Sequence, residues 1–167
     1  MPPRNSIILM DAVAIKAAHD TRCWNALRNG FELRSVPICV QEATQRSKKG
    51  RQLVDRSFEE VAAEIQLVEV TDEMLLDLDF ALGLRIDVDE GERHLLAYSL
   101  TLGRELWWLC GPDKGTLGAL HHLGKLDRMV SVEAMGRVAG HQFGNLSHQY
   151  KESWLSSQRT KYLFGDV

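Results

Sequence analysis

Four acidic residues stand at places along the chain where a carboxylate could meet a ligand. Asp11 directly follows the apolar run "SIILM" (6–10), and Asp113 follows "ELWWLCGP". In an open parallel sheet, ligands bind beyond the carboxyl ends of the strands, so acids at these two positions indicate a binding site at that edge. Each acid also has a purely structural interpretation, because an Asp after a strand often caps the next helix and "GPDKG" has the composition of a turn.

The other two acids lie within predicted helices. Glu42 is about a turn and a half into a helix that starts near Pro37, where it could equally be an ordinary surface residue. Glu92 opens an apolar helix, and its spacing from Asp89 is that of a capping box. Capping explains the acids of "IDVDEGERHLLAYSL" (86–100) only in part. A helix so apolar must be packed, which would hold Glu92 at the edge of the core.

Strand and helix alternate along the chain. Strands are predicted at 6–10, 65–70, 105–111 and 128–132, and helices at 12–30, 36–46, 58–64, 71–84, 90–103, 116–124 and 133–140. This order predicts an α/β fold with one domain, in which helices flank a central, mostly parallel β-sheet in a Rossmann-like, three-layer arrangement. We assign residues 1–144 to this domain. Residues 145–167 form a polar C-terminal helical extension or tail, which could pack on the domain or on a second copy.

The order of the four acids resembles that of the PIN-domain family of metal-dependent nucleases. The match runs through "ILMDA" with Asp11, "VPICVQEA" with Glu42, "DEGERHLLAYSL" with Glu92 and "WWLCGPDKG" with Asp113, within residues 6–140. The resemblance implies a PIN-like domain whose four carboxylates bind Mg²⁺ or Mn²⁺ and cleave RNA. It also implies that the chain could be the toxin of a toxin–antitoxin pair, with an antitoxin protein as partner, and it allows a homodimer.

The chemistry that the resemblance implies suits these residue types. Crowded carboxylates repel one another, and burial raises the pKa of the last one to ionise unless a cation lies among them. Mg²⁺ prefers oxygen ligands and keeps several of its waters. We expect Asp11 and Asp113 to be direct ligands, and Glu42 and Glu92 to bind a second ion or to orient metal-bound water for attack on the phosphodiester. Family members often carry a Thr just before the fourth acid, and Thr116 could replace it.

A bound RNA strand also needs a charged or stacking surface. The segment "QRSKKGRQLVDR" (45–56) has five basic residues that could contact the phosphate backbone. Trp24, Trp107, Trp108 or Tyr150 could stack a base. Aromatic residues inside predicted strands are more often core residues, so the basic segment is the stronger candidate.

Other functions are less consistent with these residues than a metal-dependent nuclease. The main alternative is a catalytically weak or inactive PIN-like module for binding or assembly, in which the acids only cap helices and add surface charge. A phosphotransfer site at "DVDEG" (87–91) would need a strong preceding strand, which "ALGLR" does not offer, and a calcium loop is excluded because Gly91 falls at its fifth position. His121 and His122 would point about 100° apart on a helix, so they do not indicate a zinc site.

Composition narrows the class of protein further. The chain has 167 residues, 44% of them hydrophobic, and a formal net charge of −3, so it has no overall basic character for nucleic-acid binding. Its three cysteines, Cys23, Cys39 and Cys110, are widely spaced and predict neither a disulfide framework nor a zinc site. No signal peptide or membrane span is expected, and the expected compartment is a reducing cytoplasm.

Overall fold

A four-stranded, entirely parallel sheet lies at the centre of the computed structural model, which describes residues 1–45, 54–83 and 87–165. The strand order is β3-β2-β1-β4, and the strands are β1 (Ile7–Met10), β2 (Glu32–Ser35), β3 (Gln66–Leu67) and β4 (Trp107–Cys110). Strands and helices alternate along one domain, which confirms the predicted α/β class with a parallel sheet.

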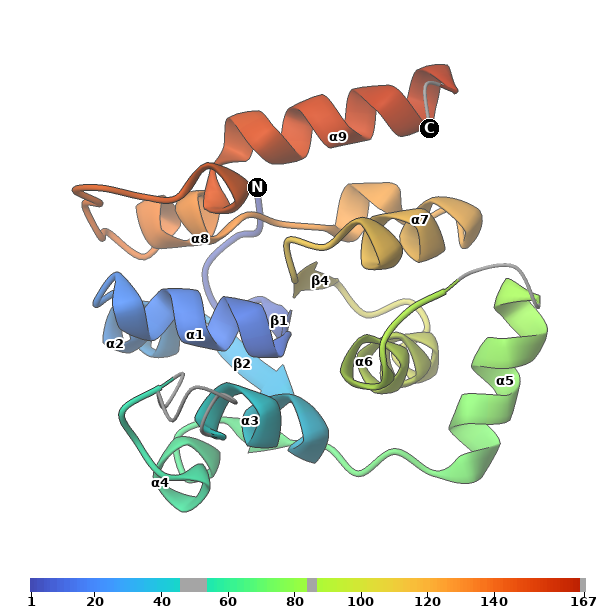
Figure 1. The fold of residues 1–167 in the computed structure, drawn as a ribbon, viewed down its shortest axis with the longest axis horizontal. Coiled ribbons are helices and arrows are strands. Elements are labelled where there is room, and N and C mark those ends of the chain that lie inside the picture. The colour runs from blue at the N-terminus through green and yellow to red at the C-terminus, as the bar shows by residue number, and fades with distance from the viewer. Residues whose placement is uncertain (46–53, 84–86, 166–167) are drawn as a thin grey trace.

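Helices cover both faces of this sheet. In Figure 1, α1 (Ala12–Asp20), α2 (Trp24–Gly30) and α3 (Pro37–Thr44) lie on one side of the strands, and α5 (Asp72–Leu82) and α6 (Glu90–Thr101) lie on the other. The remaining helical elements are α4 (Phe58–Ala62), α7 (Lys114–His122), α8 (Val132–Val138), α9 (Glu152–Phe164) and the short 3₁₀ turns η1 (Leu126–Arg128) and η2 (His148–Tyr150).

β1 is the central strand of the domain. Ile8, Leu9 and Met10 are completely buried, because β2 and β4 pair with β1 on its two edges and helices cover both of its faces. The chain places β2 and β3 on one side of β1 and returns to place β4 on the other. The strand order therefore reverses between β1 and β4, which is the switch point where open α/β sheets bind their ligands.

Three predicted elements differ from the structure. The segment 12–30 forms two helices, because the chain turns at Thr21–Cys23 and Arg22 adopts a left-handed conformation with φ of 58°. The strand predicted at 65–70 is reduced to β3, two residues long. Residues 128–132 do not form a strand: Met129 makes a single parallel bridge to Leu109, and the chain enters α8 at once.

β2 was not predicted from the sequence. It is short, and its alternation of exposed Glu32 with buried Leu33 covers too few residues to stand out. Its position between β1 and β3 is nonetheless essential, because it places α3 beside α1.

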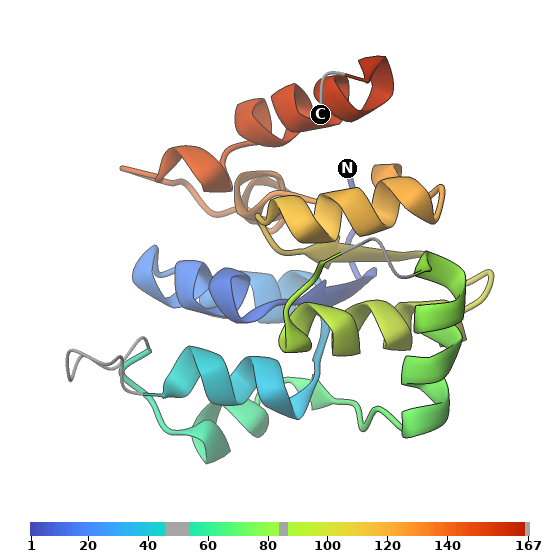
Figure 2. The ribbon, with the colours of Figure 1, turned by 45° about the vertical axis from the view of Figure 1, so that its right-hand side comes forward.

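The C-terminal segment packs on the rest of the domain. α9 lies across α7 and α8 at one end of the molecule (Figure 2), and it buries Leu155 and Gln158. Glu152 connects it to the start of α8, since its backbone N–H donates to Glu133 at 2.8 Å and its carboxylate accepts from the Ser131 hydroxyl at 2.7 Å. In this single chain, the C-terminal segment therefore packs on its own domain, which is one of the two arrangements expected from the sequence.

Two further features concern the chain as a whole. Cys23, Cys39 and Cys110 are all buried free thiols. None of the helices in the described ranges is long and apolar enough to cross a membrane.

Candidate functional site

Asp11 and Asp113 lie at the switch point, at the carboxyl ends of the neighbouring strands β1 and β4. The backbone N–H of Asp11 donates to the Cys110 carbonyl at 3.0 Å, which carries the pairing of the two strands one residue further. Asp11 caps α1 by accepting from the Val13 N–H at 3.3 Å, and Asp113 caps α7 by accepting from the backbone N–H groups of Gly115 and Thr116. The capping role is thus confirmed for both acids. It does not exclude a second role, because a carboxylate has about four lone-pair sites.

Glu92 is held at the edge of the core, as the apolar character of its helix predicts. Asp89 and Glu92 form the capping box of α6: the Glu92 N–H donates to Asp89 Oδ1 at 2.8 Å, and the Asp89 N–H donates to Glu92 Oε2 at 3.3 Å. Only 4% of Glu92 is exposed. The next turn of the helix contributes Leu95 and Leu96 to the core, so the Glu92 carboxylate cannot move into solvent without moving α6.

Glu42 comes from the opposite helix layer. It is half-buried on α3, and Cys39 lies one turn earlier on the same face of that helix. α3 contacts α6 where the second residue of α6 is a glycine. A Cβ atom at Gly91 would lie 3.0 Å from Cys39 Sγ and 3.1 Å from Glu42 Oε2. The absence of a side chain at Gly91 therefore lets the two helices bring their acids together.

Each of the four predicted acids interacts electrostatically with at least one of the others, and Asp89 interacts with three of them. Burial, followed by the charges of Asp113, Asp89 and Asp11, raises the pKa of Glu92 to about 8. Burial also raises the pKa of Asp11 to about 6, against backbone hydrogen bonds that lower it, and Asp89 adds to the rise. The pKa of Glu42 is raised by burial and then by Asp89 and Asp11. We call Asp11, Glu42, Asp89, Glu92 and Asp113 the acidic cluster.

Within residues 1–45, 54–83 and 87–165, no Lys, Arg or His side chain forms an ion pair with any of the five acids of the acidic cluster. Arg93, the residue after Glu92, instead forms an ion pair with Asp79 at 2.6 Å. Buried carboxylates without a cation are unfavourable, so the cluster favours either bound protons or a bound cation.

The acids of the cluster lie against closely packed glycines. Three glycines border them: a Cβ at Gly111 would lie 3.0 Å from the Asp11 Cβ, and one at Gly115 would lie 2.9 Å from Asp113 Oδ2 and 3.4 Å from Glu92 Oε2. A side chain at either glycine would collide with the acids, so these positions allow the close packing. Among the described residues, no three His, Cys, Asp or Glu side chains converge as a ligand set for a metal ion.

A buried hydroxyl also lies at this site. Thr116 is only 1% exposed, and its Oγ1 makes no hydrogen bond of acceptable geometry to the described residues. It lies close enough to Glu92 to lower the pKa of that carboxyl slightly against the larger effects of burial and charge. A buried polar atom without a partner indicates that water or an ion completes its hydrogen bonding.

Two members of the site were not among the predicted site residues. Asp89 was identified only as a capping residue, although the same capping geometry places its carboxylate against Glu42 and Asp11. Cys39 carried no signal of its own, but its position three residues before Glu42 places both on one face of a helix. The Cys39 Sγ lies 3.7 Å from Asp11 Oδ1.

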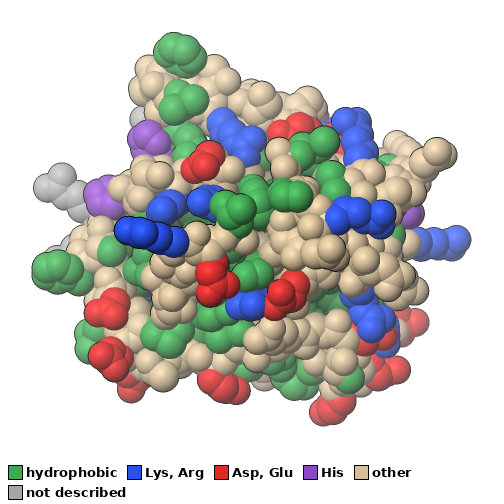
Figure 3. All heavy atoms as spheres, turned by 180° about the vertical axis from the view of Figure 1, so that it is seen from behind, with side chains coloured by type: hydrophobic (Ala, Val, Ile, Leu, Met, Phe, Trp, Pro, Cys, Tyr) green, Lys and Arg blue, Asp and Glu red, His purple; other side chains and the backbone are tan. Residues whose placement is uncertain are grey.

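The structure gives less support to the residues predicted to contact RNA. Most of the basic segment 45–56 lies outside the described residues, and Arg56, which is described, pairs with Glu64 at 2.5 Å. Trp24 and Trp107 are buried, at 4% and 3% exposure, so neither can stack a base. On the face turned away in Figure 1, basic, acidic and apolar side chains are interspersed (Figure 3).

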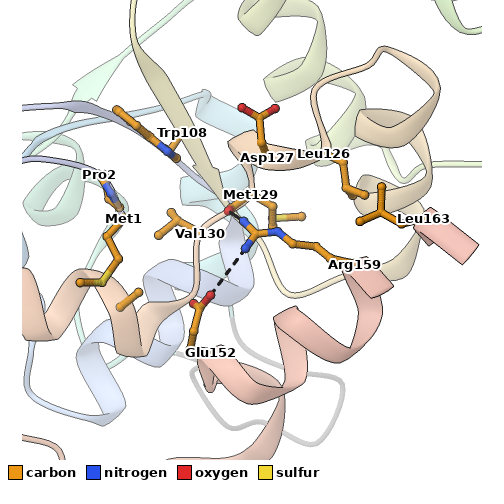
Figure 4. Close-up of a pocket in the computed structure, with 11 residues that line it drawn as sticks. Met1, Pro2, Trp108, Leu126, Asp127, Met129, Val130, Glu152, Arg159 and Leu163 are labelled. Atoms are coloured by element: carbon orange, nitrogen blue, oxygen red, sulfur yellow. Dashed lines mark hydrogen bonds and ion pairs between the residues drawn. The ribbon is translucent and has the colours of Figure 1, made fainter. Parts of the chain in front are cut away.

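A cavity of about 300 Å³ lies apart from the acidic cluster, between α9, the N-terminal residues and the segment around Met129. Its wall is mainly apolar, with Trp108, Val130 and Leu163 among the lining residues (Figure 4). The Arg159 guanidinium extends into it and is held by the Met129 carbonyl and by Glu152 at 3.5 Å. No acid of the cluster lines this cavity, so it is a separate feature of the fold.

No protein-family model matches this chain, and no curated protein matches it either.

Proposed function

We propose that the protein is a Mg²⁺- or Mn²⁺-dependent ribonuclease that hydrolyses phosphodiester bonds of single-stranded or structured RNA. The observation that carries the proposal is that five carboxylates, from the ends of two strands and from two helices, lie at the switch point of the sheet, and none of them forms an ion pair with a Lys, Arg or His of the described residues. Such a site favours a divalent cation, and a divalent cation in turn binds phosphate.

In this function the acids have different roles. Asp11 and Asp113 come from adjacent strand ends and would hold the cation from the side of the sheet. Glu42 and Asp89 come from α3 and α6 and would orient water or a second ion from the other side. Glu92, fixed by its capping box, would hold the position between them. When bound, the cation would supply a more acidic water molecule and polarise the phosphate.

The PIN-like order of the acids is the second support for the proposal. Through that resemblance we extend it to the toxin of a toxin–antitoxin pair. Expression of the chain should then arrest growth of its host, and co-expression of the product of a neighbouring reading frame should relieve the arrest and co-purify with the chain. Growth arrest that persists in the Asp11→Asn variant would contradict this extension.

The nuclease activity is tested on purified protein with single-stranded RNA. Cleavage should require Mn²⁺ or Mg²⁺, and Asp11→Asn and Glu92→Gln should each lower its rate by at least about 100-fold, since each removes a charge that neutralises the cation. Glu59→Gln is the matched control, because Glu59 is an exposed acid on α4 outside the cluster. Cleavage that survives in both cluster variants would point to a contaminant or to another site.

Metal binding alone separates this proposal from an inactive binding or assembly module. A cation that binds only the folded state stabilises it by about 2.7 kcal/mol at a concentration 100 times its Kd. Millimolar Mn²⁺ should therefore raise the melting temperature of the wild type and not that of Asp11→Asn. An unchanged melting temperature in the wild type would favour the module, in which the acids serve only as caps.

A further inference from the structure

Cys39 is an uncharged side chain whose sulfur atom contacts Asp11 of the acidic cluster. It is completely buried on α3, and its Sγ lies 3.7 Å from Asp11 Oδ1, within hydrogen-bonding range for a sulfur donor. Since a thiol is a donor and a carboxylate accepts, the S–H donates to Asp11.

This contact completes the fixation of the Asp11 carboxylate. Its Oδ2 already accepts from the Val13 N–H at 3.3 Å, and its Oδ1 accepts from Cys39. With one donor on each oxygen, the carboxylate plane cannot rotate freely about its side-chain bond. On the other side of Cys39, the space is limited by the close approach of Gly91 in α6, so the thiol itself is held in place.

We propose that Cys39 is a positioning residue: its thiol holds Asp11 in the orientation in which the acidic cluster binds a divalent cation. This inference rests on the proposed function. Hydrogen-bond partners of metal ligands commonly fix the orientation of those ligands, and losing one typically lowers metal affinity or activity by about 10- to 100-fold. The Thr116 hydroxyl, buried beside Glu92 without a hydrogen bond of acceptable geometry to the described residues, supports a ligand at this site independently of Cys39.

The chain contains a suitable control for the loss of a buried thiol. Cys23 is also completely buried, and its Sγ accepts a hydrogen bond from the Thr21 hydroxyl at 3.4 Å in place of contacting an acid. Cys23→Ala and Cys39→Ala therefore remove the same atoms from equally buried positions, but only Cys39→Ala removes a donor to Asp11.

The test compares three variants of Cys39. Cys39→Ala and Cys39→Val both lack the donor, and their side chains are smaller and larger than that of Cys, respectively. Cys39→Ser keeps a donor. Mn²⁺ affinity is measured by counting free Mn²⁺ with electron paramagnetic resonance, and RNA cleavage is followed as a function of Mn²⁺ concentration. Cys39→Ala and Cys39→Val should raise the half-saturating Mn²⁺ concentration about 10-fold, with a smaller change in kcat at saturating metal. Cys39→Ser should restore most of the affinity, and Cys23→Ala should leave it unchanged.

The possible outcomes distinguish this inference from the function on which it rests. Wild-type protein that neither binds Mn²⁺ nor cleaves RNA would overturn both. Wild-type protein that binds Mn²⁺ with the same affinity as Cys39→Ala would overturn the positioning role alone. If Cys39→Ala does not fold, Cys39→Val is compared with the wild type instead. If neither variant folds, the test is the Mn²⁺ affinity of Cys39→Ser. A loss of affinity of about 10-fold in Cys39→Ser would contradict the positioning role, because its hydroxyl keeps the donor.

Discussion

The acids of this site each combine a local role with a distant one. Asp11, Asp89 and Asp113 cap three different helices, and a helix N-terminus favours a negative charge. Glu92 reaches back to the start of its own helix in the same way. Burial and mutual repulsion act in the opposite direction and favour the protonated form of Asp11 and Glu92. The helix N-termini therefore favour negative charge at this site, whereas burial and repulsion favour its neutralisation by protons or by a bound cation.

The stability of the metal-free protein should fall as pH rises from about 5 to 8. The pKa of Glu92 rises from 4.5 to about 8 on folding, so in this window the folded state keeps a proton that the unfolded state has lost. The stabilisation is complete below the unfolded pKa and is lost as pH rises through the folded one, at a rate of up to about 1.4 kcal/mol per pH unit.

Urea denaturation at several pH values with EDTA present measures this slope. Glu92→Gln, which cannot ionise, should flatten it above about pH 7, where Asp11, with a pKa of about 6, is mostly ionised in the folded state as well. Saturating Mn²⁺ should flatten it in the wild type as well, because the cation replaces the proton. Equal slopes in the wild type and in Glu92→Gln without metal would contradict the assignment of the titration to Glu92.

At the scale of helices and strands, the site depends on close approach. α6 reaches α3 through Gly91, and the loop after β4 reaches Asp11 through Gly111. Neither glycine is required by a left-handed backbone, since neither has a positive φ. Their role is steric: each lets two segments that carry acids approach more closely than a side chain would allow.

Gly91→Ala should disturb the contact between these helices. Its Cβ would lie 3.0 Å from Cys39 Sγ and 3.1 Å from Glu42 Oε2, so these side chains must give by a few tenths of an ångström. Because Cys39 is completely buried, we expect a cost of about 1 kcal/mol in the free energy of unfolding. The Mn²⁺-induced rise in melting temperature should shrink with it. Gly118→Ala in α7 is the control, because its Cβ would make an ordinary contact of 3.4 Å with Tyr162 and a helix interior favours alanine. Two variants of equal stability would argue against this packing.

At the scale of the whole molecule, the C-terminal helix is part of the domain. α9 contacts α7 and α8, and its Leu155 is 2% exposed, whereas Leu163 near its end is 70% exposed. The segment after residue 145 is therefore joined to the domain by a buried contact, although its outer end presents apolar side chains to solvent.

Leu155→Ala should lower the free energy of unfolding by about 2–5 kcal/mol, because it leaves a cavity between α9 and the domain. Leu163→Ala on the same helix should change it by only about 0.5 kcal/mol, since that side chain is mostly exposed. Thermal denaturation monitored by circular dichroism compares the two variants. A similar loss in both would indicate that α9 docks through its exposed end, as it would in contact with a second copy.

The amino-acid sequence by itself determined the features that rest on local signals. The apolar run of β1, the Pro37 start of α3 and the capping boxes at Ser57 and Asp89 are all present as predicted, because each depends on residues within a few positions of one another. The order of the acids likewise identified Asp11, Glu42, Glu92 and Asp113 as candidates before any of their contacts were known.

Only the tertiary structure decided which distant groups meet. β2 formed because strands on either side of it pair with its four residues, while 128–132 gained a single bridge and no more. Asp89 and Cys39 joined the site because α6 packs against α3 across a glycine, a contact between segments about 50 residues apart that no local pattern encodes. Local capping energies select where a helix begins, but packing between elements decides which carboxylates must share one buried space.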